Sequence, residues 1–237
     1  GDVYKRQSKK QPPPGGFFVP GKSRTWETGS PVAMFYWKRG PEPGRMGASI
    51  TIMSILSDRL SEEILQARQR VYTVGEPTPL QRLNLPGIKA PVYAKREDLG
   101  PIRAYKWRGA FNCMAALSQE ARDKGIVAAS AGNHAQGVAL AASVLNCHAT
   151  IFMPRSTPEV KQTEVRRHGG RHVKIMLHGD CYDETAAAAH EYAETHGSTF
   201  VHPYDDLVTM AGQGTLADEV VMSGEGPFDR AYVAIGG

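Results

Sequence analysis

The chain of 237 residues is long enough for one large or two small domains, and its apolar content of 41% and charged content of 22% are ordinary for a globular protein. The net charge of +4 is unevenly distributed, because residues 1–48 hold nine Lys/Arg and three Asp/Glu, whereas the other residues hold 19 and 21. The globular part therefore gives no reason to expect a nucleic-acid partner. Every apolar run is shorter than the roughly 18 residues of a membrane-spanning helix, so no membrane partner is expected.

Residues 1–48 lack the pattern of a folded domain. Fifteen of them are Pro or Gly, and no helical or strand period persists. Such a segment cannot bury enough apolar surface to offset the entropy lost on ordering it. It is predicted to be disordered, or else to be non-native sequence ahead of a start at Met46 or Met53.

After this segment the sequence alternates between strand and helix patterns. Apolar residues spaced three or four apart predict helices over residues 57–72, 107–123, 138–145, 157–169, 180–196 and 205–222. Short apolar runs predict strands over residues 78–83, 91–94, 126–129, 149–153, 173–177, 199–202 and 231–235. This alternation predicts an α/β fold of parallel strands joined by right-handed helical crossovers.

Ligand sites in such folds lie at the carboxyl ends of strands, next to helix N-termini. Three features fall at such places: Lys106, the loop Ser130–Gly137 and the pair Gly236-Gly237. A lysine at a helix N-terminus between Tyr105 and Trp107 can have the lowered pKa that imine formation needs, although most lysines are solvated surface charges. The small residues of the loop allow backbone N–H groups to converge on a carboxylate or phosphate, and Asn133 adds an amide donor. A simple strand-to-helix turn would have the same composition.

The histidines and cysteines give no metal motif. The closest histidine pairs are His168 with His172 and His190 with His196. Neither pair fits the H-E-x-x-H motif, and no carboxylate stands at a matching position, so they are interpreted as solvated or hydrogen-bonding side chains. Three widely spaced cysteines, Cys113, Cys147 and Cys181, are predicted to be buried free thiols in a reducing compartment.

Glu97 and Asp98 are adjacent carboxylates that could work as an acid–base pair. However, neighbouring residues on a strand or turn usually point in different directions. Structural pairing with Arg96 or Arg108 is therefore the favoured interpretation.

Two motifs in order resemble the serine/threonine dehydratases, a family of fold-type II pyridoxal-phosphate enzymes. The motifs are Lys95-Arg-Glu-Asp98 followed by Ala104-Tyr-Lys-Trp-Arg-Gly-Ala110, and then Ser130-Ala-Gly-Asn-His-Ala-Gln-Gly137. Further matches follow at Met153-Pro154, Gly169-Gly170, His202-Pro-Tyr-Asp205 and Ala211-Gly-Gln-Gly-Thr-Leu216. The resemblance covers residues 57–237 and is nearest to the biosynthetic threonine dehydratases of that family.

The resemblance implies a tryptophan synthase beta-like fold with parallel sheets and crossover helices. It implies a smaller α/β domain over residues 128–203. A larger, truncated cofactor domain is then made of residues 49–127 and 204–237.

The resemblance also implies the roles of the site residues. Lys106 is expected to bind the pyridoxal-phosphate aldehyde as a Schiff base and to act in catalysis, with Tyr105 near the cofactor ring. Asn133 is expected to hydrogen-bond the phenolic oxygen, and Gly236 and Gly237 to begin the loop that holds the phosphate. The substrate carboxylate is expected to bind the backbone N–H groups of Ser130, Ala131, Gly132, Asn133 and His134. No metal is implied.

The implied reaction is the deamination of L-threonine to 2-oxobutanoate and ammonia, the first step of isoleucine biosynthesis, by a cytoplasmic homo-oligomer. L-serine dehydratase, serine racemase and threonine synthase activities stay open as alternatives within the family. A further alternative is an inactive truncated protein that serves only in binding or assembly. It is considered because the chain reaches only Gly237, where the family continues into the loop that holds the cofactor phosphate. The family usually has Ser where Ala104 stands, and this departure removes one polar contact but not the nucleophile.

Overall fold

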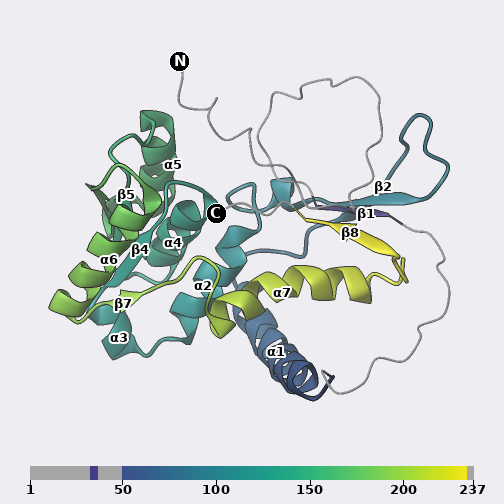
Figure 1. Ribbon diagram of the computed structural model, residues 1–237, viewed down its shortest axis with the longest axis horizontal. Coiled ribbons are helices and arrows are strands. Elements are labelled where there is room, and N and C mark those ends of the chain that lie inside the picture. The colour runs from purple at the N-terminus through teal and green to yellow at the C-terminus, as the bar shows by residue number, and fades with distance from the viewer. Residues whose placement is uncertain (1–32, 37–49, 234–237) are drawn as a thin grey trace.

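The computed structural model describes residues 33–36 and 50–233, which form two four-stranded sheets with helices between and around them (Figure 1). One sheet has the strand order β6-β5-β4-β7, and all of its pairings are parallel. The other has the order β2-β3-β1-β8, and all of its pairings are antiparallel. The predicted α/β class is confirmed, whereas the predicted boundaries between two domains stay a prediction.

The parallel sheet is built from consecutive strand–helix units. Its strands are β4 (Ile126–Ala129), β5 (Ala149–Met153), β6 (Val173–Leu177) and β7 (Thr199–Phe200), and the crossover helices are α4 (Asn133–Val144), α5 (Glu159–Gly169) and α6 (Tyr182–His196). Alternate residues of β4 enter two different cores. Ile126 and Ala128 pack in the core that contains α2 and α4, and Val127 and Ala129 pack against α6. Burial on both faces explains why this strand is apolar throughout.

The antiparallel sheet differs from the predicted parallel arrangement. Its strands are β1 (Ala33–Tyr36), β2 (Leu80–Leu83), β3 (Val92–Lys95) and β8 (Arg230–Tyr232). Residues 84–91 alone connect β2 to β3, and this is too short for the crossover that a parallel pair needs. The position of β1 corrects the prediction of disorder for part of the N-terminal segment, since its backbone pairs with β3 and β8. The rest of residues 1–48 lies outside the described residues.

Three helices differ in extent from their predictions. The helix predicted over 138–145 is α4, which begins at Asn133 and so includes part of the predicted loop. Helix α1 (Ile50–Val71) begins before residue 57. The helix predicted over 107–123 is instead α2 (Lys106–Ala116) followed by α3 (Gln119–Asp123). The break occurs because Leu117 is extended and the Ser118 side chain accepts from the Ala121 N–H, capping a new helix. The helix predicted to begin at Asp205 or Asp206 is α7 (Leu207–Met222), capped by the Asp206 side chain.

Helix α2 lies between the two sheets and is crossed closely by α4 and α7 (Figure 1). A Cβ atom on Gly137 of α4 would lie 2.9 Å from the Trp107 Cα. A Cβ atom on Gly212 of α7 would lie 2.5 Å from the Arg108 carbonyl oxygen. Glycine at both crossings therefore allows the backbones of α4 and α7 to contact the backbone of α2 directly. These two contacts fix the N-terminal turn of α2 from two sides.

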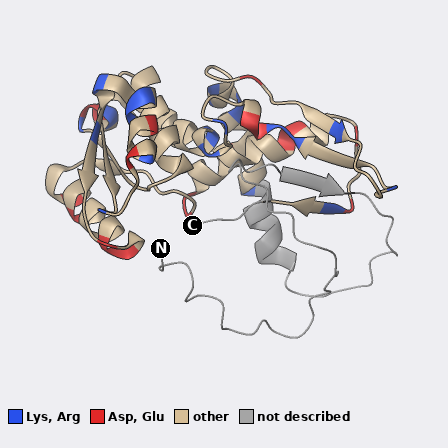
Figure 2. Cartoon of the chain, turned by 90° about the horizontal axis from the view of Figure 1, so that it is seen from above, with Lys and Arg blue, Asp and Glu red and all other residues tan. Residues whose placement is uncertain are grey.

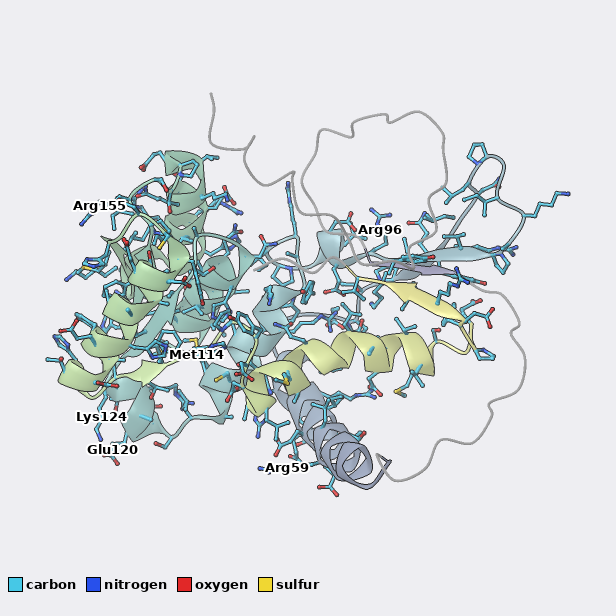
Figure 3. The ribbon with its side chains drawn as sticks, in the orientation of Figure 1. Arg59, Arg96, Met114, Glu120, Lys124 and Arg155 are labelled. Carbon is cyan, nitrogen blue, oxygen red and sulfur yellow. The ribbon has the colours of Figure 1, made fainter. Side chains whose placement is uncertain are left out.

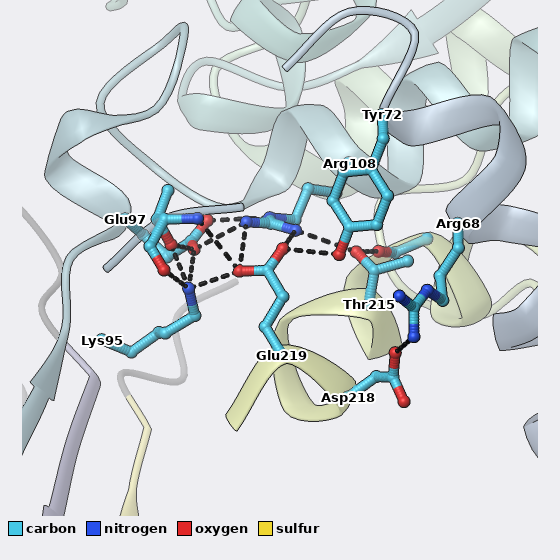
Figure 4. Close-up of polar contacts among 10 residues, drawn as sticks. Arg68, Tyr72, Lys95, Glu97, Arg108, Thr215, Asp218 and Glu219 are labelled. Carbon is cyan, nitrogen blue, oxygen red and sulfur yellow. Dashed lines mark hydrogen bonds and ion pairs between the residues drawn. The ribbon is translucent and has the colours of Figure 1, made fainter. Parts of the chain in front are cut away.

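A buried cluster of four charges, which we call the ion cluster, joins α2 to the antiparallel sheet and to α7. Its members are Lys95 of β3, Glu97 of the 3₁₀ helix η1 (Glu97–Leu99), Arg108 of α2 and Glu219 of α7 (Figure 4). Arg108 donates from Nε and Nη2 to Glu97, each at 2.9 Å, and also donates to Glu219. Lys95 pairs with both carboxylates. Two positive and two negative charges are thus buried together. The predicted structural pairing with Arg96 or Arg108 is confirmed, and the structure assigns Glu97 to Arg108 and Asp98 to Arg96.

The neighbours of the ion cluster satisfy its remaining polar atoms. Thr215 accepts from Arg108 at 3.0 Å, and Tyr72 donates to Glu219 at 2.7 Å. Burial alone would raise the pKa of Glu219, but hydrogen bonds from Arg108, Lys95 and Tyr72 hold it below its ordinary value. Burial together with the hydrogen bond to Glu219 raises the pKa of Tyr72 to about 12. The carboxylate is therefore ionised and the phenol protonated at neutral pH.

The surface of the described residues mixes charges of both signs, with Lys/Arg and Asp/Glu interspersed over the helices and strands (Figure 2). The side chain of Met114 is fully buried in the interior, whereas Glu120 and Lys124 form an exposed ion pair on the outside at α3 (Figure 3).

Within residues 33–36 and 50–233, no helix is long and apolar enough to cross a membrane. Of the cysteines, Cys113 and Cys147 are buried as predicted, but Cys181 is exposed because it precedes α6 in a surface turn.

Replacement of Gly212 by alanine tests the crossing of α2 and α7. In an exposed helix this change stabilises by about 1 kcal/mol, because alanine is the better helix former. Here the added Cβ would meet two backbone atoms within 2.6 Å, so a loss of about 1–3 kcal/mol in unfolding free energy is expected. Urea denaturation measures it. The control is Gly132→Ala, where a Cβ would meet nothing within 4 Å, and a stabilised Gly212→Ala protein would contradict the crossing.

Replacement of Glu97 by glutamine tests the ion cluster. The change keeps the shape of the side chain but leaves two buried cations facing one carboxylate. A loss of about 3–5 kcal/mol is expected, because an uncompensated buried charge is costly. The matched control is Glu120→Gln at the exposed pair with Lys124, where little change is expected. Equal stability of the two variants in urea denaturation would show that the ion cluster is not a constraint on the fold.

Candidate active site

The carboxyl ends of β4 and β7 lie side by side, because these two strands are parallel neighbours in the sheet. The loop of residues 130–132 follows β4 and leads into α4. The segment of residues 201–206 follows β7 and leads into α7. The N-terminus of α2 reaches this same edge, since the Lys106 Nζ donates to the Pro203 carbonyl oxygen at 2.9 Å. Three chain segments that are distant in sequence therefore meet where α/β folds bind ligands.

Lys106 is the first residue of α2, and its amine is half-buried. Burial lowers the pKa of the Lys106 amine, which raises its neutral, nucleophilic fraction near neutral pH. The Nζ lies 5.7 Å from the centre of the Tyr105 ring. Among the described residues no carboxylate forms an ion pair with Lys106, so no negative charge there holds the amine in its charged form.

The loop after β4 leaves donors unused. Two N–H groups of the loop are already used. The Ser130 N–H, predicted to bind the substrate carboxylate, instead donates to the Phe152 carbonyl oxygen of β5 at 3.0 Å, which extends the strand pairing, and the Gly132 N–H donates to Ser130 Oγ at 3.2 Å. The N–H groups at the start of α4 have no acceptor within the described part of the chain, as expected for the first turn of a helix. The Asn133 side chain likewise has no partner among the described residues, and it is only partly buried. These free donors and the positive end of the helix dipole can bind an anion.

His134 occupies the interior behind this loop and is 3% exposed. Its Nε2 lies 3.0 Å from the Val201 carbonyl oxygen. A carbonyl can only accept, so Nε2 carries the proton and Nδ1 is an unprotonated acceptor, which has no partner among the described residues. Burial, together with a smaller effect of the nearby charge of Lys106, lowers the pKa of His134 to about 4. The ring is therefore neutral at physiological pH and adds no charge beside Lys106.

The segment after β7 was missing from the sequence-based site. It was recognised only as part of the motif His202-Pro-Tyr-Asp205, and the residues alone gave it no role. In the structure the Val201 carbonyl holds His134, and the Pro203 carbonyl holds Lys106. Any residue type can supply a backbone carbonyl, so sequence patterns cannot reveal these contacts.

The predicted site residues thus divide into two groups. Lys106, Tyr105 and the stretch Ser130–His134 belong to elements that meet at one edge of the parallel sheet. Gly236 and Gly237 lie outside the described residues, so a phosphate-binding role for them stays a prediction. The individual roles of all these residues likewise stay predictions.

Several curated relatives resemble this chain in sequence. The L-threonine dehydratase biosynthetic IlvA of Mycobacterium tuberculosis is 46% identical over 177 residues, which are 74% of this chain and 41% of the relative. The protein of the same name from Burkholderia multivorans is 44% identical over 178 residues, 74% of this chain and 35% of the relative. The chain therefore spans less than half the length of these relatives.

Solved structures share its fold. The processed form of threonine deaminase isoform 2 from Solanum lycopersicum is 38% identical with a TM-score of 0.62, over 71% of this chain and 47% of that one. Maize serine racemase is 29% identical with a TM-score of 0.61, over 69% and 49%. The predicted fold class, that of fold-type II pyridoxal-phosphate enzymes, is confirmed. A family model described as pyridoxal-phosphate dependent enzyme matches residues 71–237, and the chain belongs to this family.

Proposed function

We propose that this chain supplies the reactive lysine and the carboxylate-binding loop of a pyridoxal-phosphate dependent ammonia-lyase that converts L-threonine to 2-oxobutanoate and ammonia. The observation that carries the proposal is the convergence of the Lys106 amine and the open N-terminus of α4 on one edge of the parallel sheet. The relatives named L-threonine dehydratase, which are 41–46% identical, support the choice of substrate.

The residues at this edge fit pyridoxal phosphate. An aldehyde requires a primary amine with an accessible lone pair, and Lys106 has a lowered pKa and no ion pair among the described residues. A phenolic oxygen requires a neutral donor, and the free amide of Asn133 supplies one. Lys106 would hold the cofactor covalently, Asn133 would hydrogen-bond it, and Tyr105 would lie beside it. When bound, the cofactor supplies the sink for the electrons released as the substrate Cα–H bond breaks.

The residues of the chain perform the remaining tasks. The free N–H groups of Ala131, Asn133 and His134 bind the substrate carboxylate and orient the amino acid. The neutral Lys106 amine accepts the Cα proton, because burial favours its unprotonated form. Net loss of water across Cα and Cβ, followed by hydrolysis at Cα, gives the oxo acid and ammonia. Because the His134 ring is neutral, it places no second positive charge beside Lys106.

Related activities on the same site are L-serine dehydration and serine racemisation. The structural similarity to maize serine racemase favours keeping serine as a second substrate. We place the enzyme in the cytoplasm and in the pathway to isoleucine, as a homo-oligomer, in line with the biosynthetic naming of the relatives. Rates of oxo-acid release from L-threonine and L-serine separate the two substrates. A protein that binds cofactor but turns over neither would support the non-catalytic alternative.

Replacement of Lys106 by alanine is expected to abolish covalent cofactor capture, since the variant lacks the reacting amine. The measurement is borohydride reduction of the chain with pyridoxal phosphate, followed by mass spectrometry of the peptide that contains residue 106. In the natural protein the same change is expected to remove oxo-acid release. The control Lys124→Ala removes an exposed lysine of the Glu120 ion pair and should leave capture intact. Adduct at another lysine in the Lys106→Ala chain would refute the assignment.

Replacement of Asn133 by alanine is expected to weaken pyridoxal-phosphate binding about tenfold or more, because one hydrogen bond to a partly charged oxygen is lost. An absorbance titration gives the half-saturating cofactor concentration. Asn146→Gly serves as the control, since Asn146 is exposed and its positive φ of 51° suits glycine. Unchanged half-saturation in Asn133→Ala would remove Asn133 from the cofactor contacts.

A further inference from the structure

The turn that follows β7 is closed by a histidine side chain. The His202 Nδ1 accepts from the Asp205 N–H at 2.7 Å and from the Tyr204 N–H at 3.3 Å. The carbonyl of Pro203, between these residues, accepts from Lys106. Because Nδ1 is the acceptor, the neutral ring carries its proton on Nε2. The side chain thus replaces the backbone hydrogen bond that would otherwise stabilise such a turn.

We propose that His202 is a positioning residue for Lys106: it closes the 202–205 turn and so aims the Pro203 carbonyl at the lysine amine. Without the acceptor at His202 Nδ1 the Pro203 carbonyl can rotate away, since the Tyr204 N–H in the same peptide unit is no longer held. The Lys106 amine would then move outward into water. His202 touches neither substrate nor cofactor in this account, and it acts only through the turn.

The protonation state of His202 determines whether the turn is closed, and the surroundings of the ring shift its pKa. Burial lowers the pKa of His202, the charges of His190 and Lys106 lower it further, and those of Asp205 and Asp206 oppose the shift. The ring packs edge-on against Phe200 and Tyr204, with centroid distances of 6.1 and 4.6 Å. Above its lowered pKa the ring is neutral and Nδ1 accepts. Below that pKa a proton occupies Nδ1, the two N–H donors lose their acceptor, and the turn opens.

The inference rests on the proposed function only where it takes Lys106 as the reactive amine. The contact of Lys106 with Pro203 exists in the chain without cofactor, so it can be measured there. Failure of cofactor capture at Lys106 would remove the proposed function and leave the link between His202 and Lys106 open to measurement.

The experiment is competitive acylation of the chain with trace acetic anhydride over a range of pH, with each lysine peptide quantified by mass spectrometry. In the wild type the midpoint for Lys106 should lie below that for the exposed Lys124. His202→Ala is expected to move the Lys106 midpoint upward by roughly 0.5–1 pH unit, because the amine becomes better solvated. It should also raise the plateau reactivity, because the amine becomes more accessible.

Two further variants separate positioning from general damage to the fold. His202→Asn should restore the wild-type Lys106 midpoint, since its side-chain carbonyl can accept from N–H groups two and three residues ahead. His196→Ala should have no effect, because His196 is exposed and bonds only within its own helix. Wild-type behaviour of His202→Ala would overturn the proposal, and so would equal shifts in the Ala and Asn variants.

Hydrogen exchange gives an independent readout of the same turn. In the wild type, protection of the Tyr204 and Asp205 amides should fall as the pH drops through the pKa of His202. In His202→Asn this protection should not change over the same range, because the amide side chain does not titrate. Protection that is independent of pH in the wild type would contradict the role of Nδ1.

Discussion

The ion cluster of Lys95, Glu97, Arg108 and Glu219 is the constraint on which the placement of the site depends. Four charges buried together are stable only when every partner is in place, because one uncompensated charge in the interior is expensive. The ion cluster therefore has one acceptable arrangement of β3, η1, α2 and α7. Lys106 is two residues before Arg108, so the cluster that fixes α2 also fixes where the lysine amine emerges, on the other side of the helix.

The site combines this fixed helix with neighbours of Lys106 that carry no charge. The amine is half-buried, its hydrogen-bond acceptor is a neutral carbonyl, and its histidine neighbour is neutral. Carboxylates that would hold it protonated are used elsewhere, in the ion cluster and at the surface. Helix α2 therefore carries two cationic residues in different surroundings: Arg108 is fully paired, whereas Lys106 has no ion pair among the described residues. The lack of an ion pair makes Lys106 suited to nucleophilic chemistry.

Sequence patterns predicted the local parts of this structure and missed most of the long-range ones. The strand–helix alternation of residues 126–200, the lysine at the start of α2 and the glycine-rich loop all leave a short-range signal, and the structure contains them. Glu97 and Asp98 could be paired with Arg96 or Arg108 because few alternatives lie nearby in sequence. Glu219 could not be assigned to Arg108, since 111 residues separate them. The pairing of β1 with β3 and β8 was missed for the same reason, because β1 is distant from both strands in sequence.

The order in which these parts can form follows from their sequence separation. The parallel sheet draws its strands from one continuous stretch, residues 126–200, so its contacts close short loops. The ion cluster closes only when Glu219 is available, because that residue supplies the counter-ion of both Lys95 and Arg108. During synthesis from the N-terminus, the parallel sheet can therefore assemble while Lys95 and Arg108 still share the single carboxylate of Glu97. The docking of α7 then buries the cluster and, in the same step, gives the lysine its final position.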